Sequence, residues 1–494
     1  MMTVRTGARQ AVALVTFLAT LAVPAVASAQ VTALTFEEVL ESLERTHPKL
    51  EQARRKIDKA RAEALGARGA FDVQLDANAE GRRIDEEKRY GLWDVTLNQP
   101  LMPLGINIYA GWRGSSGPVS DWKDQFTHSV AGMKGWTNDP LSDPMGELHA
   151  GATVSLLKNR AFDDRRAARR DTALGVDVAT MDLGVAWNGL VAKAAGAYWG
   201  WVASGQQLQI ARDLLRLAEL RQEQIAEQVR RGAFAPIELI ENERSILKRR
   251  GEVLKAERKF RESAVKLSLY LRDMDNQPVR PSEARVPDAL PSRSAPLDAN
   301  LEELIERSLD LLPEWRRLQL ERQRLDLKRR LARNSLNPKL DAQLGVGRAV
   351  HIQSLFATPE VLGALKFSMP LQMREARGKL NAADADIARL DAERRQLRDT
   401  IAANIREAFV GLEVLTQQID VTRRELDISQ QVERAERDRF ALGASSLLIV
   451  NLREQATADA AARLVDVEAE FQAATARWLA ITGQVNPVSA DADE

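Results

Sequence analysis

The sequence predicts a mainly α-helical protein that also contributes membrane β-strands, with the same plan used twice along the chain. The first observation is a weak internal repeat: Glu37 aligns with Glu302, a shift of 265 residues, and Ala197 aligns with Ala408, a shift of 211 residues. The others are long segments with coiled-coil spacing and short segments in which apolar and polar residues alternate. A duplication of this kind indicates one supersecondary unit used twice.

Residues 1–29 have the features of a cleaved signal peptide. Arg5 and Arg9 form a basic start, residues 11–23 form a short apolar run, and residues 27–29 form a small-residue cleavage site. We therefore expect the mature chain to be exported.

Composition excludes several classes of protein. Lys and Arg number 70 and Asp and Glu number 70, so the net charge is zero and no global basic field would attract nucleic acid. The 494 residues include no cysteine, which excludes disulfides, cysteine-based metal sites and a lipidated N-terminus. After the signal peptide no stretch approaches ~20 consecutive apolar residues, so any membrane crossing must be made by strands.

The sequence contains no catalytic motif, and we predict that the protein is not an enzyme. It has no P-loop, no G-x-S-x-G and no H-E-x-x-H. The histidines lie far apart without ligand spacing, at His47, His128, His149 and His351. We expect no cofactor and no metal site.

Two segments, about 160–231 and about 374–442, are predicted to be very long helices. The helix after the first carries apolar residues at spacings of three and four, as in Phe260, Ala264 and Leu267, and this pattern buries a narrow seam against other helices. About 70 helical residues extend on the order of 100 Å. Six glycines between positions 175 and 205 predict bends or breaks. Periodicity alone fits a solvated coiled coil equally well.

Gly232 and Gly443 each lie where one helical pattern stops and another starts. Glycine suits the left-handed position that ends a helix, and Pro236 fits the first turn of the next helix. Both sites predict tight helix-turn-helix tips.

Four short segments alternate apolar and polar residues without a fault, at 73–80, 152–156, 340–344 and 365–369. Alternation puts one face of a strand in an apolar setting and the other in water. Taken singly, such segments are commoner in soluble sheets. The signal peptide and lengths suited to ~9–11-residue tilted spans favour an outer-membrane barrel.

The first repeat has a larger strand region than the second, with the extra residues at 91–151. The helices before and after this region must lie on the same side of the membrane, so the number of crossings must be even. Two strands or four in the first repeat satisfy this condition. The extra segment therefore adds either two more strands or only a loop.

Several motifs recur in both repeats or fall at the predicted tips. They are Leu34-Thr35-Phe36-Glu37-Glu38 with His47-Pro48, Leu301-Glu302-Glu303 with Leu312-Pro313, Gln99-Pro100-Leu101, Met369-Pro370-Leu371, Arg231-Gly232 and residues 439–445. Through their order and the duplication, the whole mature chain resembles the outer-membrane efflux proteins, the TolC-like channels of export systems.

That resemblance implies a homotrimeric outer-membrane β-barrel continued by a long periplasmic α-helical barrel. Each subunit of such proteins gives four strands to a shared twelve-stranded barrel. The expected divisions are the signal peptide (1–29), a first repeat (30–283) with strands at about 72–157 and a tip at 232, a connector (284–300), a second repeat (301–484) with strands at about 338–370 and a tip at 443, and a C-terminal tail (485–494).

The resemblance also implies passive conduction, as the exit duct of a tripartite efflux or type I secretion system. The expected partners are a periplasmic adaptor (a membrane fusion protein), an inner-membrane pump of the RND, ABC or MFS type and outer-membrane lipid. The residues identify neither the transported substrate nor the class of pump. A competing hypothesis is a periplasmic coiled-coil adaptor or scaffold without a membrane span, which leaves the alternating strands without a purpose.

By the same resemblance the two tips contact the adaptor, at Arg231, Gly232, Ala233, Phe234, Leu442, Gly443, Ala444, Ser445 and Leu447. Family members close the periplasmic end with polar side chains just after the second tip, often aspartates. This chain has no aspartate in the turn after Gly443. The candidates for the constriction are Asn451, Arg453, Glu454 and Asp438.

Overall fold

The structure is a computed structural model that describes residues 32–83, 89–102, 104–116, 146–291, 300–349 and 359–485. The predicted signal peptide (1–29), residues 292–299 of the predicted connector and residues 486–494 of the predicted tail lie outside these ranges. His128 and His351 lie outside them as well.

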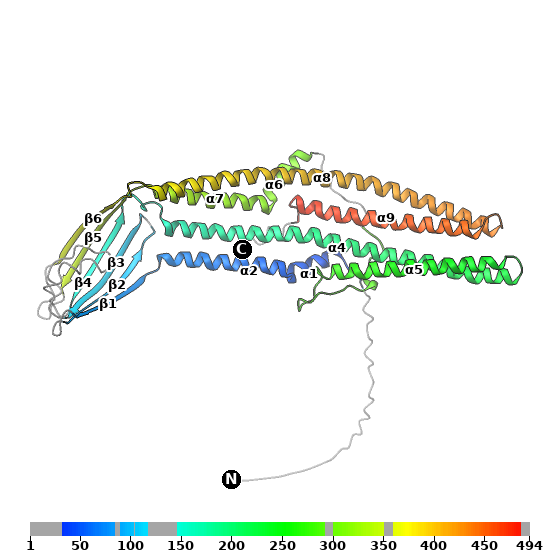
Figure 1. The fold of residues 1–494 in the computed structure, drawn as a ribbon, viewed down its shortest axis with the longest axis horizontal. Coiled ribbons are helices and arrows are strands. Elements are labelled where there is room, and N and C mark those ends of the chain that lie inside the picture. Colours follow the sequence, from blue (N-terminus) through cyan, green and yellow to red (C-terminus); the bar gives the residue numbers. More distant parts are fainter. Residues whose placement is uncertain are drawn as a thin grey trace, which may run out of the picture.

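Eight α-helices make up most of the described chain. They are α1 (Phe36–Thr46), α2 (Pro48–Arg68), α4 (Asp164–Arg230), α5 (Pro236–Leu267), α6 (Leu301–Leu311), α7 (Pro313–Asn334), α8 (Arg374–Ala441) and α9 (Leu447–Ile481), with 3-10 turns η1 (Gly69–Phe71) and η3 (Glu283–Arg285). α4 has 67 residues and α8 has 68, so each extends roughly 100 Å. The helices run along the long axis of the molecule, with the sheet at one end and the α4–α5 and α8–α9 turns at the other (Figure 1).

Each half of the chain opens with a short helix followed at once by a second one. The side chains of Thr35 and Asn300 cap the two short helices by accepting hydrogen bonds from the backbone N–H groups of Glu38 and Glu303, which satisfies one donor at each helix start. Pro48 and Pro313 are the first residues of the helices that follow. Proline is preorganised for this position and lacks only an N–H that would be unpaired anyway.

α4 runs without a break from Asp164 to Arg230, so the breaks predicted from its glycines are absent from this helix. It is packed against α2, α5, α7 and α9. Tertiary packing of this kind compensates for the low helix propensity of glycine. One glycine is needed for close approach: a Cβ at Gly205 would lie 2.8 Å from both methyl carbons of Val286.

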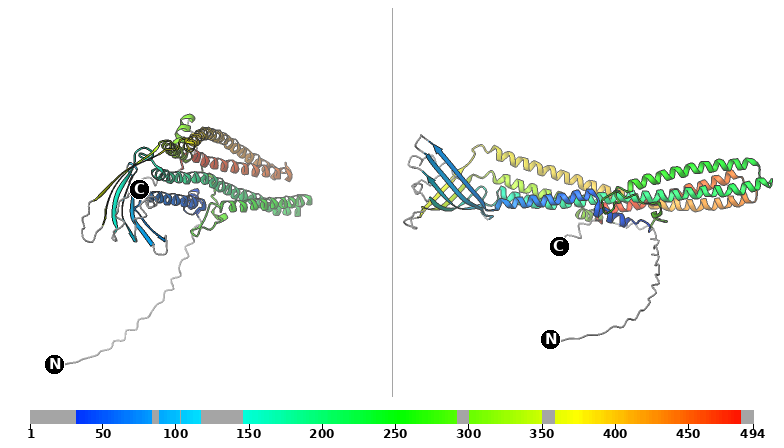
Figure 2. Two further views of the ribbon diagram at one scale, coloured as in Figure 1. Left: turned by 60° about the vertical axis from the view of Figure 1, so that its left-hand side comes forward. Right: turned by 90° about the horizontal axis from the view of Figure 1, so that it is seen from below.

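The strands form a single antiparallel meander in the order β1-β2-β3-β4-β5-β6. Their bounds are β1 (Gln74–Arg83), β2 (Arg89–Pro100), β3 (Ile106–Ser116), β4 (Glu147–Ser155), β5 (Lys339–Ala349) and β6 (Glu360–Ser368). Seen from further directions, the sheet curves as it leaves the ends of α2, α4, α7 and α8 (Figure 2).

β2 and β3 decide the strand count that the sequence leaves open. The first half of the chain has four strands and the second has two, which makes six in the described sheet. The expectation of four strands per subunit, implied by the resemblance, is therefore wrong for this chain. β5 and β6 pair directly with each other, whereas β2 and β3 lie between β1 and β4 as an additional hairpin.

The two faces of the sheet differ in chemistry because side chains alternate along each strand. Large apolar side chains are exposed on one face, at Leu75, Val95, Leu97, Ile108, Leu148, Leu344, Val346, Val361, Leu365 and Phe367. The opposite face carries polar groups, including Asp76, Asp94, Thr96, Tyr109, Arg113, Glu147, His149, Asp341 and Gln343.

The helical core is divided into clusters along the length of the bundle. The largest forms where α1, α4, α5 and α9 meet, around the buried side chains of Tyr198, Trp201 and Leu208. The Tyr198 hydroxyl donates a hydrogen bond of 2.6 Å to the backbone oxygen of Leu34. This bond fixes the segment just before α1 to α4. A second cluster joins α6, α8 and α9 around Ile405 and Trp478. None of the described helices combines the length and apolarity that crossing a membrane requires.

We expect Leu208→Ala to destabilise the helical bundle by about 2–5 kcal/mol, because Leu208 is completely buried in the largest cluster and its removal leaves a cavity. Arg216→Ala on the same helix is the control. Arg216 is 70% exposed and pairs only with Asp213 nearby, and such pairs contribute about 0–1 kcal/mol. Unfolding followed by helical circular dichroism in detergent measures both, and equal effects would contradict the assigned core.

Candidate functional site

The two helical tips have the same backbone geometry. In the first, Gly232 N–H donates to the Val229 oxygen (3.0 Å) and Ala233 N–H to the Gln228 oxygen (2.9 Å). In the second, Gly443 N–H donates to the Phe440 oxygen (3.0 Å) and Ala444 N–H to the Arg439 oxygen (2.8 Å). This pair of bonds is the Schellman motif, which requires a left-handed residue, and both glycines have a φ of 73°.

The tips lie beside each other at the same end of the molecule. The rings of Phe234 and Phe440 are 5.7 Å apart between centroids, so the α4–α5 turn contacts the end of α8. Leu442 is 84% exposed, whereas Leu447 is buried at the start of α9. The Ser445 hydroxyl donates a hydrogen bond to the Glu436 carboxylate. The result is a small paired surface of backbone turns on which Leu442 is the most exposed apolar side chain, with Ile237 and Leu448 also exposed nearby.

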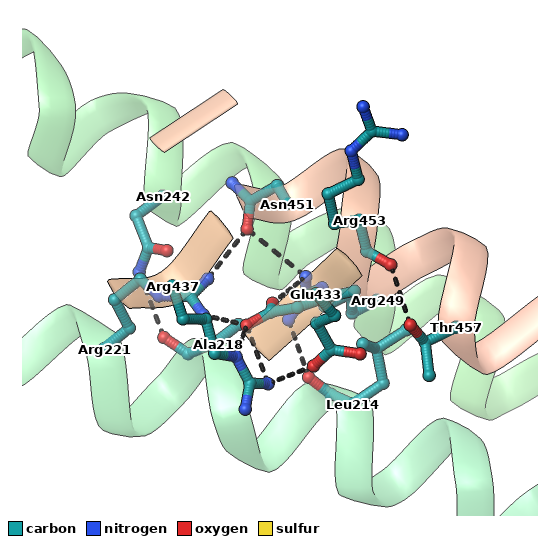
Figure 3. Close-up of polar contacts among 11 residues, drawn as sticks. Leu214, Ala218, Arg221, Asn242, Arg249, Glu433, Arg437, Asn451, Arg453 and Thr457 are labelled. Atoms are coloured by element: carbon teal, nitrogen blue, oxygen red, sulfur yellow. Dashed lines mark hydrogen bonds and ion pairs between the residues drawn. The ribbon is translucent and has the colours of Figure 1, made fainter. Parts of the chain in front are cut away.

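Just inside the tips, a buried carboxylate joins all four helices of the two hairpins. Glu454 of α9 accepts hydrogen bonds from Arg221 of α4, from Arg249 Nη2 of α5 at 2.8 Å and from Arg437 Nε of α8 at 3.1 Å. The Glu454 side chain is 0% exposed, and that of Arg249 is 3% exposed. Figure 3 shows the side chains of Arg221, Arg249 and Arg437 converging between the helices. We call Glu454 and its three arginines the carboxylate clamp.

Neighbouring polar groups accept further hydrogen bonds from the arginines of the carboxylate clamp. Asn451 Oδ1 accepts hydrogen bonds from Arg221 Nη1 (2.9 Å) and Arg249 Nη2 (3.3 Å). Arg249 Nη1 donates to the backbone oxygen of Leu214 at 2.8 Å, and Arg437 also pairs with Glu433 at 2.6 Å. A buried charge is tolerated only when it is paired and hydrogen-bonded in this way.

Burial alone would raise the pKa of the Glu454 carboxyl, but hydrogen bonds and positive charge from Arg221 and Arg249 outweigh it and hold the pKa below its ordinary value. Burial lowers the pKa of Arg249, and the bond to Glu454 opposes that shift. Because the folded pKa of Glu454 is depressed, its stabilising contribution is present above the unfolded pKa. That contribution is lost as the pH falls through the folded pKa.

The four residues predicted for the constriction separate into two pairs. Asn451 and Glu454 face α4 and α5 within the carboxylate clamp. Arg453 is exposed, and Figure 3 shows its side chain directed away from the clamp. Asp438 is also exposed, one residue after Arg437. The constriction itself stays a prediction.

Sequence reasoning missed Arg221, Arg249 and Arg437, although the sequence contains a signal for one of them. Arg249 lies three residues after Ile246 and four before Val253, so it takes a place in the apolar stripe of α5. A charged residue at a seam position indicates a buried partner on another helix. The partner lies more than 200 residues away along the chain, and this distance hides it from local patterns.

Two comparisons relate the chain to known proteins. Residues 301–484 match the family model "Outer membrane efflux protein". The chain also has the fold of solved outer-membrane channels over nearly its whole length. The predicted resemblance to the TolC-like outer membrane efflux proteins is confirmed. No curated protein is similar enough in sequence to count as a match.

Three solved structures illustrate the shared fold. The CmeC outer membrane channel of Campylobacter jejuni is 12% identical, with a TM-score of 0.63, over 92% of this chain and 88% of that one. The outer membrane protein VceC of Vibrio cholerae is 13% identical, with a TM-score of 0.60, over 91% and 96%. The open state of the Neisseria gonorrhoeae MtrE outer membrane channel is 15% identical, with a TM-score of 0.63, over 91% and 88%.

Metal binding is a separate question for this charged end of the molecule. Within the described ranges, no group of three or more His, Asp or Glu residues could hold a metal ion. Two of the buried charged groups near the tips, Glu454 and Arg249, are paired with each other across α9 and α5.

We expect Glu454→Gln to loosen α8 and α9 from α4 and α5, because it leaves three arginines without their shared carboxylate. Breaking one partner of a buried pair costs about 3–5 kcal/mol. Hydrogen exchange of the α9 amides near Glu454 should accelerate in detergent-purified protein.

The matched control is Glu425→Gln on α8, which breaks an exposed pair with Arg463 and should cost about 0–1 kcal/mol. Equal exchange rates in both variants would show that the carboxylate clamp does not hold the two hairpins together.

Proposed function

We propose that this protein is the outer-membrane channel of a tripartite efflux or type I secretion system, conducting solutes passively. The observation that supports the proposal most directly is the sheet with one apolar and one polar face, joined to helices roughly 100 Å long. The match to outer membrane efflux proteins over 301–484 supports the same assignment.

The sheet suits a membrane barrel rather than a soluble core. Its strands have 9 to 12 residues, close to the ~9–11 residues of tilted transmembrane strands. Within the part of the chain that the structure describes, no helix lies over the sheet in Figures 1 and 2, so lipid is the natural solvent for Leu344, Val361 and Leu365. The scaffold hypothesis gives this face no partner.

The proposed assembly is a homotrimer whose helices form a periplasmic tube. A sheet of six strands is too small to close on itself, because the smallest membrane barrels have about eight strands. Its open edges would leave unpaired backbone groups in lipid. Association of identical copies removes both edges, and the number three is taken from the resemblance to TolC-like channels.

In this proposal the paired tips dock a periplasmic adaptor, which couples the channel to an inner-membrane pump. The residues involved are those predicted from the sequence, with exposed Leu442 as the main apolar contact. The carboxylate clamp then keeps the periplasmic end closed at rest by holding α8 and α9 against α4 and α5. Arg453 and Asp438, both exposed, are the proposed pore-facing groups.

Purified protein reconstituted in planar lipid bilayers should give discrete ion conductance, and it should migrate as a heat-modifiable oligomer on gels. The protein should resist carbonate extraction from membranes because its sheet is embedded. The channel proposal would be overturned in favour of a periplasmic scaffold if carbonate extracts the protein from membranes, or if the purified protein is monomeric and gives no conductance.

Gly443→Val should abolish export while oligomers still assemble, because a β-branched residue is strained at a φ of 73° and would distort the docking tip. The readout is growth on toxic compounds to which a deletion strain has first been shown to be sensitive. Gly251→Val is the control, since Gly251 lies within α5 with no atom within 4 Å of an added Cβ. Unchanged export in the Gly443 variant would mean that this turn is not a docking site.

A further inference from the structure

We propose that the β2–β3 hairpin is part of the membrane-spanning wall, so that three copies of this chain close a barrel of eighteen strands. The inference rests on the proposed channel function and adds the width of the pore across the membrane. It departs from the twelve strands that the resemblance to TolC-like channels implies.

The outer face of the hairpin is as apolar as that of its neighbours. Val95 and Leu97 on β2 and Ile108 on β3 are 38%, 49% and 41% exposed. Leu97 pairs with Leu75 of β1, so the apolar band of β1 continues onto the hairpin without a change of face. A flap lying in water would gain nothing from this pattern.

The inner face of the hairpin is bonded into the rest of the sheet. Thr96 of β2 contacts His149 Nε2 of β4 at 3.2 Å, although β3 lies between them. The intervening residue is Gly111, and a Cβ there would lie 2.5 Å from the Thr96 hydroxyl oxygen. Because Gly111 has no side chain, Thr96 of β2 and His149 of β4 can contact each other above it.

A second glycine on an intervening strand allows a similar contact between β3 and β5, which belongs to the second half of the chain. The Tyr109 hydroxyl of β3 accepts a hydrogen bond of 3.2 Å from Gln343 Nε2 of β5. It passes over Gly151 of β4, where a Cβ would lie 2.4 Å from the hydroxyl oxygen. Arg113 and Glu147 add an ion pair of 2.5 Å between β3 and β4.

These contacts identify the concave side of the sheet. Strands two apart are separated by roughly 10 Å at their backbones, so contacts between their side chains over an intervening glycine favour a surface that curves toward them. The polar face is therefore concave, as the inside of a barrel must be. β2 and β3 share that curvature with β4 and β5.

The turn of the hairpin fits against the helical part. Gln99 Nε2 donates a hydrogen bond of 2.6 Å to the backbone oxygen of Phe71, just after α2. At the turn, Gly105 has a φ of 62°, and an added Cβ would lie 2.6 Å from the Asn159 backbone oxygen. Asn159 belongs to the segment between β4 and α4, so the turn is packed at the junction of sheet and helices.

Closure with eighteen strands is geometrically regular. In a six-strand meander β1 and β6 run in opposite directions, so β6 of one copy can pair antiparallel with β1 of the next. With strands about 4.8 Å apart and tilted by about 40°, eighteen strands give a backbone diameter of about 36 Å, against about 24 Å for twelve. Such a pore admits bulky cargo at the membrane and leaves selection to the periplasmic end.

Spin labels can test the position of the hairpin, because the chain has no native cysteine. Ile108→Cys and Asn107→Cys place labels on the outer and inner faces of β3. Leu344→Cys and Gln343→Cys are the matched pair on β5, which is a strand in either architecture. In liposomes, the label at 108 should match that at 344, with high oxygen and low nickel-complex accessibility. The labels at 107 and 343 should show the reverse.

The outcomes separate the two proposals. If the label at 344 lies in lipid but that at 108 lies in water, the hairpin is outside the wall, and this inference fails while the channel stands. If all four labels lie in water, the channel proposal itself fails. Native mass spectrometry of the particle supplies the copy number: three chains support eighteen strands, and any other number overturns the count.

Discussion

Backbone hydrogen bonding in an apolar solvent is the constraint on which this architecture depends. Each N–H or C=O left unpaired in lipid costs several kcal/mol, so a sheet with one apolar face cannot keep two free edges. β1 and β6 are such edges in a single copy. In the proposed channel a closed ring of copies meets the constraint, and the long helices form a second ring attached to the first.

The helical part faces the opposite problem, because its charges must be paired where the helices converge. Along most of the bundle, arginines and acids form exposed pairs of small energetic value, such as Arg463 with Glu425. The carboxylate clamp differs because Glu454 is inaccessible to water and serves three arginines from three helices. The bonds around Glu454 form one network, so they are expected to form or break together. Such a network suits the proposed closure of the periplasmic end better than a row of independent ion pairs.

Local sequence patterns predicted much of the fold, whereas contacts between segments far apart in the sequence could not be predicted. The tips at Gly232 and Gly443 could be located because the left-handed residue that ends a helix is usually glycine. The order of helices and strands could be inferred from the repeat. Strands at 94–98 and 106–112 could be suggested but not assigned, because a short alternating pattern does not show whether a segment pairs into the sheet. The continuity of α4 was missed because packing, rather than propensity, stabilises its glycine-rich part. Arg221 and Arg249 were missed because each lies more than 200 residues from Glu454 along the chain.

The six strands also agree with the width of the helical layer to which they are joined. α2, α4, α7 and α8 lie in that order, each against the next. Four helices at spacings of 8–10 Å cover roughly 32–40 Å of arc. Six strands about 4.8 Å apart and tilted by about 40° cover about 38 Å, whereas four would cover only about 25 Å. With the additional hairpin, the sheet and the helices can therefore meet at one radius, and the proposed channel needs no narrowing where it enters the membrane.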